Sequence, residues 1–218
     1  MTQLKNSIAL EYKEYFHNGD RRDIFKLLAD YYEIHSAIYP GSYIDIAPSF
    51  YIPLTVYVDS FKKTNKFFED NSIFSFISKN KTYKSKPNLR YYNMDYNSDF
   101  GEEEENFDLL ISLYAGFVSQ SCKKYLKEGG ILLTNNSHGD ASMAYLDDDF
   151  EFIAAIYRSN RQYRLTNKNL EKYFIPKNPE LIVTKDYIRK IGRGIGYTKT
   201  ASAYVFQKGK DLNKVNLL

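Results

Sequence analysis

The sequence predicts an α/β protein in which a mostly parallel, doubly wound sheet carries helices on both of its faces. Three observations carry this prediction. Short apolar runs alternate with segments of helical character through five repeats along the chain. The run Leu109-Leu110-Ile111 is apolar throughout, as expected of a strand that is buried on both sides. The glycine turn Pro40-Gly41 directly follows the first strand candidate, which is how a nucleotide-binding βα unit opens.

Two helices are expected ahead of the first strand. In the second of them, five side chains recur at the three- and four-residue steps of one helical face, and Asp20 stands at the N-cap position. These five are Ile24, Leu27, Leu28, Tyr31 and Tyr32. The elements expected in the first half are helices over 4–16 and 21–35, strands over 37–39 and 55–59, a helix within 60–79 that turns Phe61, Phe67 and Phe68 inward, and a strand over 89–93.

The second half continues the alternation of strand and helix. The turn Glu128-Gly129-Gly130 separates a helix from the strand that follows it. Three acids, Asp147 to Asp149, suit the positive N-terminal end of a later helix. The elements expected here are strands over 107–113, 131–134 and 204–206 and helices over 115–127 and from 143 to about 157, while 163–192 is compatible with short strands, helices or both.

Length and composition bound the class of protein. A chain of 218 residues fits one domain, 1–218, in which residues 1–35 form helices that precede the core. The net charge of +3 is too small to indicate a polyanionic partner by itself. Cys122 is the only cysteine, which excludes an intramolecular disulfide and a cysteine-based zinc cluster, so no metal site is predicted. The N-terminus lacks the apolar core of a signal peptide and no apolar run reaches membrane-spanning length, which favours a cytoplasmic protein without a membrane partner.

Ligands of doubly wound sheets bind at the carboxyl ends of the strands, so the residues after each strand are the first candidates for a site. Gly41 would let the backbone approach a ligand closely. Asp59 ends the second strand 18 residues beyond Gly41, where an acid normally grips a pair of ribose hydroxyls. Asp95, after the third strand, is placed to accept from the exocyclic amine of an adenine. After the fourth strand, small and aromatic residues over 112–116 would wall a flat ring.

A polar cluster over 135–140 follows the fifth strand. Within it, His138 is a candidate general base that Asp140 would orient. The alternative is a surface histidine that is hydrogen-bonded to its neighbours.

The ordered series of these motifs resembles class I S-adenosylmethionine (SAM)-dependent methyltransferases, which have a Rossmann-like fold. The resemblance covers roughly residues 20–140 and rests on five segments: Ala37-Ile38-Tyr39-Pro40-Gly41-Ser42, Val58-Asp59, Met94-Asp95, Phe107-Asp108-Leu109-Leu110-Ile111, and Leu126-Lys127-Glu128-Gly129-Gly130-Ile131-Leu132. It implies a SAM cofactor with its methionine part near Gly41, its ribose on Asp59 and its adenine beside Asp95. The implied cofactor-binding residues are Tyr39, Pro40, Gly41, Ser42, Asp59, Ser60, Asp95, Tyr96, Ser112, Leu113, Tyr114, Ala115 and Gly116.

The chain departs from the family pattern in its first motif, which usually holds several glycines and here keeps only Gly41. A non-catalytic module that binds SAM or a nucleotide on the same fold therefore remains the alternative function. The glycine-rich run over 192–196 is followed by a strand-like segment, so it is interpreted as a flexible turn and not as a dinucleotide fingerprint. An NAD-dependent oxidoreductase is disfavoured because the first turn lacks G-x-G-x-x-G.

The methyl acceptor, a small molecule or a macromolecule, cannot be named from the sequence. Basic and aromatic residues mix over 79–86, as in single-stranded nucleic-acid sites, but a lysine-rich loop has the same composition. The acidic run over 102–105 is expected to be a solvated loop, and Cys122 a buried, small apolar side chain.

Overall fold

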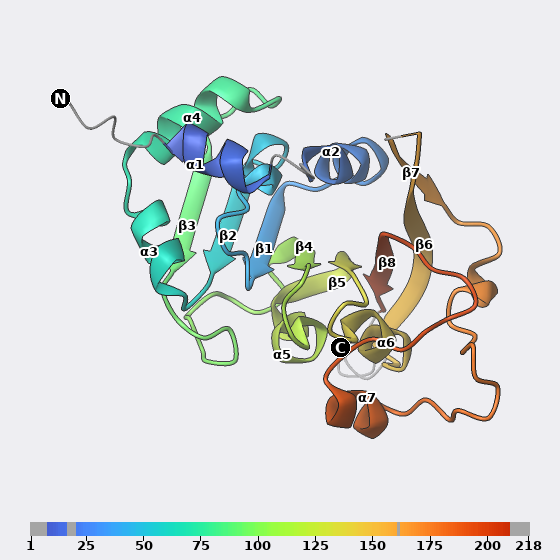
Figure 1. The fold of residues 1–218 in the computed structure, drawn as a ribbon. Coiled ribbons are helices and arrows are strands. Elements are labelled where there is room, and N and C mark those ends of the chain that lie inside the picture. The colour runs from blue at the N-terminus through green and yellow to red at the C-terminus, as the bar shows by residue number, and fades with distance from the viewer. Residues whose placement is uncertain (1–7, 17–20, 161, 210–218) are drawn as a thin grey trace, which may run out of the picture.

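The computed structural model describes residues 8–16, 21–160 and 162–209, and in these the strands form one eight-stranded sheet (Figure 1). The strands are β1 (Ser36–Pro40), β2 (Leu54–Val58), β3 (Asn88–Tyr92), β4 (Phe107–Ser112), β5 (Leu126–Thr134), β6 (Phe150–Ser159), β7 (Gln162–Thr166) and β8 (Ala203–Lys208). Their spatial order is β3-β2-β1-β4-β5-β8-β6-β7. The first five strands pair in parallel, whereas β8 is antiparallel to β5 and β6, and β6 and β7 form an antiparallel hairpin. The predicted mostly parallel, doubly wound sheet is confirmed.

Helices cover both faces of this sheet, as predicted. They are α1 (Ile8–Tyr15), α2 (Arg22–Tyr31), α3 (Lys62–Phe68), α4 (Ser72–Asn80), α5 (Val118–Cys122), α6 (Asp140–Tyr145) and α7 (Lys185–Ile191), with 3₁₀ turns η1 (Ala47–Phe50), η2 (Lys123–Tyr125) and η3 (Leu170–Lys172). Side chains of β1 alternate between two buried clusters: Tyr39 packs with α2 and α4, and Ile38 packs with α5 and α6. None of the described helices combines the length and the apolar character needed to cross a bilayer.

The first half follows the prediction with local differences. The helix expected over 21–35 ends at Tyr31, which is 61% exposed and does not join the buried face. The segment 60–79 holds two helices, α3 and α4, and Phe61 precedes them at 58% exposure, so its predicted inward orientation is wrong. Asp20 lies outside the described residues.

The helix expected from 143 to about 157 is wrong. Residues 140–145 form the short helix α6, and 150–159 form strand β6. The three acids lie in the turn between them, where the carboxylate of Asp147 accepts from Lys123 at 2.9 Å and pairs with Lys185 at 3.3 Å. The acids therefore lie between a helix and a strand, and ion pairs with two partly exposed lysines hold Asp147 in the turn.

Two further loops differ from their predicted character. The helix expected over 115–127 is shorter, because Leu126 already pairs with Phe107 as the first residue of β5, and the predicted turn at 128–130 is an irregularity inside this strand. In the acidic run, Glu102 is buried, and accepts from Arg90 Nη1 and from Tyr92 Oη at 2.8 Å each. The run over 102–105 is thus not a fully solvated loop. Cys122 is buried, as predicted.

Candidate functional site at the carboxyl edge of the sheet

The bend after β1 and the acid after β2 lie side by side. β1 and β2 pair with Pro40 opposite Val58, so the two strands end at the same level. Gly41 turns the chain with a φ of +65° and donates its amide to Val58 O at 2.8 Å. The amide of Tyr43 donates to Asp59 Oδ2 at 2.8 Å. One hydrogen bond therefore joins the predicted glycine turn to the predicted ribose-binding acid.

Asp59 is half-buried, and both of its carboxylate oxygens already accept a backbone amide. Oδ2 accepts from Tyr43, and Oδ1 accepts from Phe61 N at 2.8 Å. A carboxylate oxygen has two acceptor positions, so each oxygen keeps one for a ligand hydroxyl. Tyr91 Oη donates to the backbone oxygen of Asp59 at 2.9 Å and fixes the end of β2. Ser60, the next residue, is exposed at the same edge.

The space beside Gly41 is filled by protein. A Cβ atom added to Gly41 would lie 2.5 Å from Ala115 Cβ and 3.9 Å from the ring of Tyr96. A Cβ on Gly116 would lie 2.6 Å from Tyr96 Oη. Tyr96 is half-buried between these glycines, and burial raises the pKa of its hydroxyl. Gly41 is therefore required by its left-handed φ and by tight packing within the chain.

Three of the predicted cofactor-binding residues are turned into the core. Tyr39, Pro40 and Ser42 are all buried. Tyr39 Oη accepts from Arg21 Nη1 at 3.1 Å and donates to Asp45 Oδ2 at 3.2 Å, and Arg21 pairs with Asp45 at 2.9 Å. Burial opposes the charge of Arg21, but Tyr39 and Asp45 outweigh it and raise the arginine pKa. These three residues support the edge from inside and have no surface to offer a cofactor.

Asp95 stands in the loop after β3, as predicted. Its side chain is exposed, and Oδ1 accepts from both the backbone amide and the side-chain amide of Asn97 at 2.8 Å. The second carboxylate oxygen remains available to a ligand.

The residues after β4 point in different directions. Ser112 and Leu113 are buried, whereas Tyr114 has a φ of +60° and is 57% exposed. A left-handed φ strains a bulky residue by about 1–3 kcal/mol. The amide of Tyr114 lies 3.4 Å from Asn135 Oδ1, and the guanidinium of Arg21 lies 4.7 Å from the centre of its ring. Of the predicted stretch over 112–116, Tyr114 is the side chain that projects to the surface.

The predicted pair of His138 and Asp140 is corrected by the structure. Asp140 is 1% exposed, and its carboxylate accepts from Ser112 Oγ and Ser119 Oγ at 2.5 Å each and from Ser119 N at 3.0 Å. His138 lies on the surface, where its Nδ1 is 3.0 Å from Ser137 Oγ. Asp140 is thus a buried acceptor that ties the end of β4 to the starts of α5 and α6. It does not orient the histidine.

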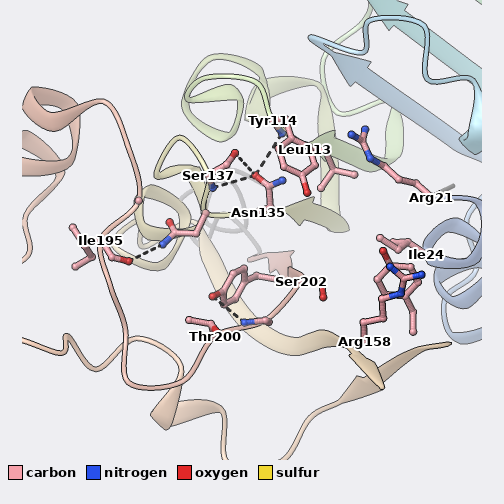
Figure 2. A pocket seen from close by; sticks show the side chains of 15 residues that line it. Arg21, Ile24, Leu113, Tyr114, Asn135, Ser137, Arg158, Ile195, Thr200 and Ser202 are labelled. Carbon is pink, nitrogen blue, oxygen red and sulfur yellow. Dashed lines mark hydrogen bonds between the residues drawn. The ribbon is translucent and has the colours of Figure 1, made fainter. Parts of the chain in front are cut away.

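A cleft of about 640 Å³ opens at the same edge of the sheet, next to Tyr114 (Figure 2). We call it the edge cleft. It is lined by Arg21, Ile24, Leu113, Tyr114, Asn135, Asn136, Ser137, Arg158, Tyr163, Gly194, Ile195, Thr200, Ala201, Ser202 and Tyr204. These residues come from the N-cap and first turn of α2, the ends of β4 and β5, the hairpin of β6 and β7, the loop before β8 and the start of β8. The lining holds two arginines and no acid.

The glycine-rich run over 192–196 forms one wall of the edge cleft. Gly194 N donates to Ser137 O at 3.4 Å, and Asn136 Nδ2 donates to Ile195 O at 3.5 Å. A Cβ on Gly194 would lie 1.9 Å from Asn136 O, so only glycine fits here. The run is a loop, as predicted, but close packing against the post-β5 segment holds it in place.

Sequence reasoning missed most residues of the edge cleft. The helix predicted over 143–157 is the reason that Arg158 and Tyr163 escaped notice. A strand over this segment would end at the carboxyl edge of the sheet, and the post-strand rule would then select the residues around its end. Asn135 directly follows β5, and the same post-strand rule that selected Asp59 could have selected it. For Arg21 the sequence carries no local signal, since it enters the site from the helix ahead of the core.

Comparison with solved structures shows similar folds at low sequence identity. A proposed O-methyltransferase from Klebsiella pneumoniae matches with a TM-score of 0.50 and 11% identity, covering 72% of this chain and 86% of that one. A methyltransferase from Geobacter sulfurreducens (TM-score 0.49, 10% identity, 76% and 90% covered) and an O-methyltransferase from Bacillus cereus in complex with SAH (0.49, 10%, 72% and 86%) are also similar. No family model and no curated protein matches the chain. The chain therefore has the fold that its motifs resemble, that of class I SAM-dependent methyltransferases.

Proposed function

We propose that the protein is a SAM-dependent methyltransferase whose acceptor binds in the edge cleft. The observation that carries the proposal is the joining of Asp59 to the post-β1 bend through Tyr43, at the edge where this fold binds ligands. The edge cleft begins one residue away from Ala115, which packs against that bend. Donor and acceptor regions are thus neighbours along one loop.

The residues at the end of β2 fit the ribose of the cofactor. Asp59 keeps one acceptor position on each oxygen, which suits two adjacent hydroxyls, and Ser60 is exposed beside it. Asp95 has one free carboxylate oxygen for an adenine amine. The methionine part would lie near Gly41 only if Ala115 and the half-buried ring of Tyr96 move aside, because these two residues occupy the adjoining space.

The cofactor supplies a methyl group already activated on a sulfonium, so the chain has to orient the acceptor more than to activate it. Orientation alone can contribute about 7–11 kcal/mol to lowering a barrier. An acceptor that loses a proton would also need a base, and the exposed His138 beside the edge cleft is the candidate, held through Nδ1 by Ser137.

Calorimetric titration with SAM and with SAH tests the proposal. We expect binding to the natural chain, and at least tenfold weaker binding to Asp59→Asn, which loses one acceptor. Asp148→Asn removes an exposed carboxylate in the turn before β6 and should bind as the natural chain does. Tyr96→Ala should bind more tightly, because Ala115 alone then has to move. If the natural chain binds neither compound at millimolar concentration, the proposal is wrong.

A second candidate is a non-catalytic module that binds SAM or a nucleotide on this fold. The packing of Ala115 and Tyr96 beside Gly41, and the absence of an Asp140 contact to His138, favour it. Tight SAM binding without methyl transfer to any acceptor in a cell extract, followed with a labelled methyl group, would support this candidate over the enzyme.

A further inference from the structure

We infer that the edge cleft binds a small aromatic anion, an arene that carries a carboxylate or a phosphate. That this ligand is the methyl acceptor rests on the proposed function, whereas its binding does not. A volume of about 640 Å³ is that of a small-molecule site. The lining holds two arginines, two exposed or half-exposed tyrosine rings and no acid. The arginines favour a negatively charged ligand, and the rings favour a flat, aromatic one.

Arg158 supplies the free positive charge. It is exposed at the end of β6, and none of the ion pairs found among the described residues involves it. Its guanidinium lies 5.7 Å from the centre of the Tyr163 ring, across the hairpin. A guanidinium presents a planar fork of N–H donors that matches a carboxylate or a phosphate.

Arg21 supplies a second, fixed cation. Asp45 and Tyr39 hold its Nη1 on the buried side, and its side chain is 20% exposed. Figure 2 shows Arg21 and Arg158 on one side of the edge cleft and Asn135 on the other. Asp45 neutralises part of the Arg21 charge, so Arg158 is expected to contribute most to anion affinity.

The aromatic preference follows from Tyr114 and Tyr163. Tyr114 keeps a strained, left-handed φ and holds its ring 57% exposed at the wall of the edge cleft. Such strain persists where the surrounding structure imposes it, and it clusters at ligand sites. Tyr163 provides a second ring beside Arg158. Aromatic rings in contact attract one another beyond the effect of the area they bury, so these tyrosines favour an aromatic ligand.

Asn135 provides an unused hydrogen-bond donor. The residue is 6% exposed, and its Oδ1 accepts from Ser137 Oγ at 2.8 Å. Its Nδ2 is buried and has no acceptor among the described residues. A buried donor without an acceptor destabilises the fold, because it has lost its hydrogen bond to water. An oxygen atom of a ligand in the edge cleft would satisfy this donor once the atoms that cover Nδ2 move aside.

A nucleic acid is a poorer match to these features. The basic stretch over 79–86 precedes β3 and therefore lies at the amino edge of the sheet, opposite the edge cleft. The basic stretch and the two cleft arginines cannot form one continuous basic surface along the carboxyl edge.

The probes are phenyl phosphate, benzoate, the neutral compound phenol, and inorganic phosphate, titrated without SAM and followed by calorimetry and ligand-observed NMR. We expect phenyl phosphate or benzoate to bind at least tenfold more tightly than phenol, and the stronger of the two identifies the anionic group. Arg158→Ala should weaken that binding at least tenfold. Arg164→Ala is the matched control, because Arg164 is exposed on β7 next to Tyr163 but projects to the other face of the hairpin.

Tyr114→Gly tests the contribution of the aromatic ring independently of the two arginines. It also relieves the left-handed strain, so the variant should remain folded. It should weaken the binding of the aromatic probes and leave that of inorganic phosphate unchanged. The inference is overturned if the natural chain and Arg158→Ala bind phenyl phosphate with equal affinity. It is also overturned if the natural chain binds phenol as tightly as it binds the anions. Probe binding by a chain that fails to bind SAM would refute the proposed function alone, and SAM binding without probe binding would refute the inference alone.

Discussion

Asp140 is a buried acid whose ionisation should make the stability of this protein depend on pH. Burial raises the pKa of Asp140 to about 6, although hydrogen bonds from Ser112 and Ser119 act in the opposite direction. In the unfolded chain the ordinary value is 3.8. The folded protein therefore holds this proton more tightly than the unfolded chain does. We expect the substitution Asp140→Asn to remove this dependence.

The sign and size of the effect follow from proton linkage. Because the folded-state pKa is raised, the stabilisation is complete below about pH 3.8 and is lost as the pH rises through about 6. The difference between these pKa values corresponds to about 3 kcal/mol, of which about 2 kcal/mol falls between pH 4.5 and pH 7.5. Relative to Asp140→Asn, the natural chain should lose about 2 kcal/mol over that interval.

Urea unfolding followed by circular dichroism at several pH values measures this difference. Comparing the two proteins cancels the other titrating groups, and Asp148→Asn serves as the control because that carboxylate is exposed in the nearby turn. The control should follow the pH dependence of the natural chain. If the natural chain and Asp140→Asn show parallel curves of unfolding free energy against pH, Asp140 does not hold a raised pKa and the reasoning fails.

Three glycine substitutions separate backbone strain from steric overlap, and each is measured by urea unfolding. Gly129→Ala should cost about 1 kcal/mol, because its φ is +73° but no described atom lies within 4 Å of the added Cβ. Gly41→Ala should lower the free energy of unfolding by more, because the added Cβ is strained in the same way and also lies 2.5 Å from Ala115 Cβ. Equal losses for the two substitutions would show that this contact relaxes freely. Gly194→Ala should cost about 1–3 kcal/mol through overlap with Asn136 O and should weaken phenyl phosphate binding; an unchanged affinity would mean that the loop does not shape the edge cleft.

The parallel core was predictable because its strands are short apolar runs that end in turns. The same reasoning failed at β6, whose burial does not alternate with a period of two and whose register with β8 shifts between Phe152 and Ala154. On one side it pairs with β7, the next strand along the chain, but its partner on the other side, β8, begins only at Ala203. Nothing within 150–159 reveals the distant partner β8, and the apolar segment is therefore also compatible with a helix.

The edge of the sheet that carries the candidate site was predictable, but the side chains that line the site were not. The post-strand rule found Asp59 and Tyr114, because strand direction alone decides which residues reach the carboxyl edge. It also selected Tyr39, which is buried, because the rule does not say which way a side chain turns. Asp140 was paired with His138 by proximity in sequence, whereas the start of α6 directs its carboxylate to Ser112 beneath the edge.

The loop after β4 connects the two parts of the candidate site. Ala115 packs against Gly41 in the bend that hydrogen-bonds to Asp59, whereas Tyr114, one residue earlier, walls the edge cleft beside Arg21. A shift that makes room beside Gly41 must therefore move Ala115, which is bonded directly to Tyr114. Because any coupling free energy between two ligands is reciprocal, SAM should change the affinity of phenyl phosphate by the same factor by which phenyl phosphate changes that of SAM. Titrating each ligand in the presence of the other measures both factors, and two factors of one would show that the loop keeps the two regions independent.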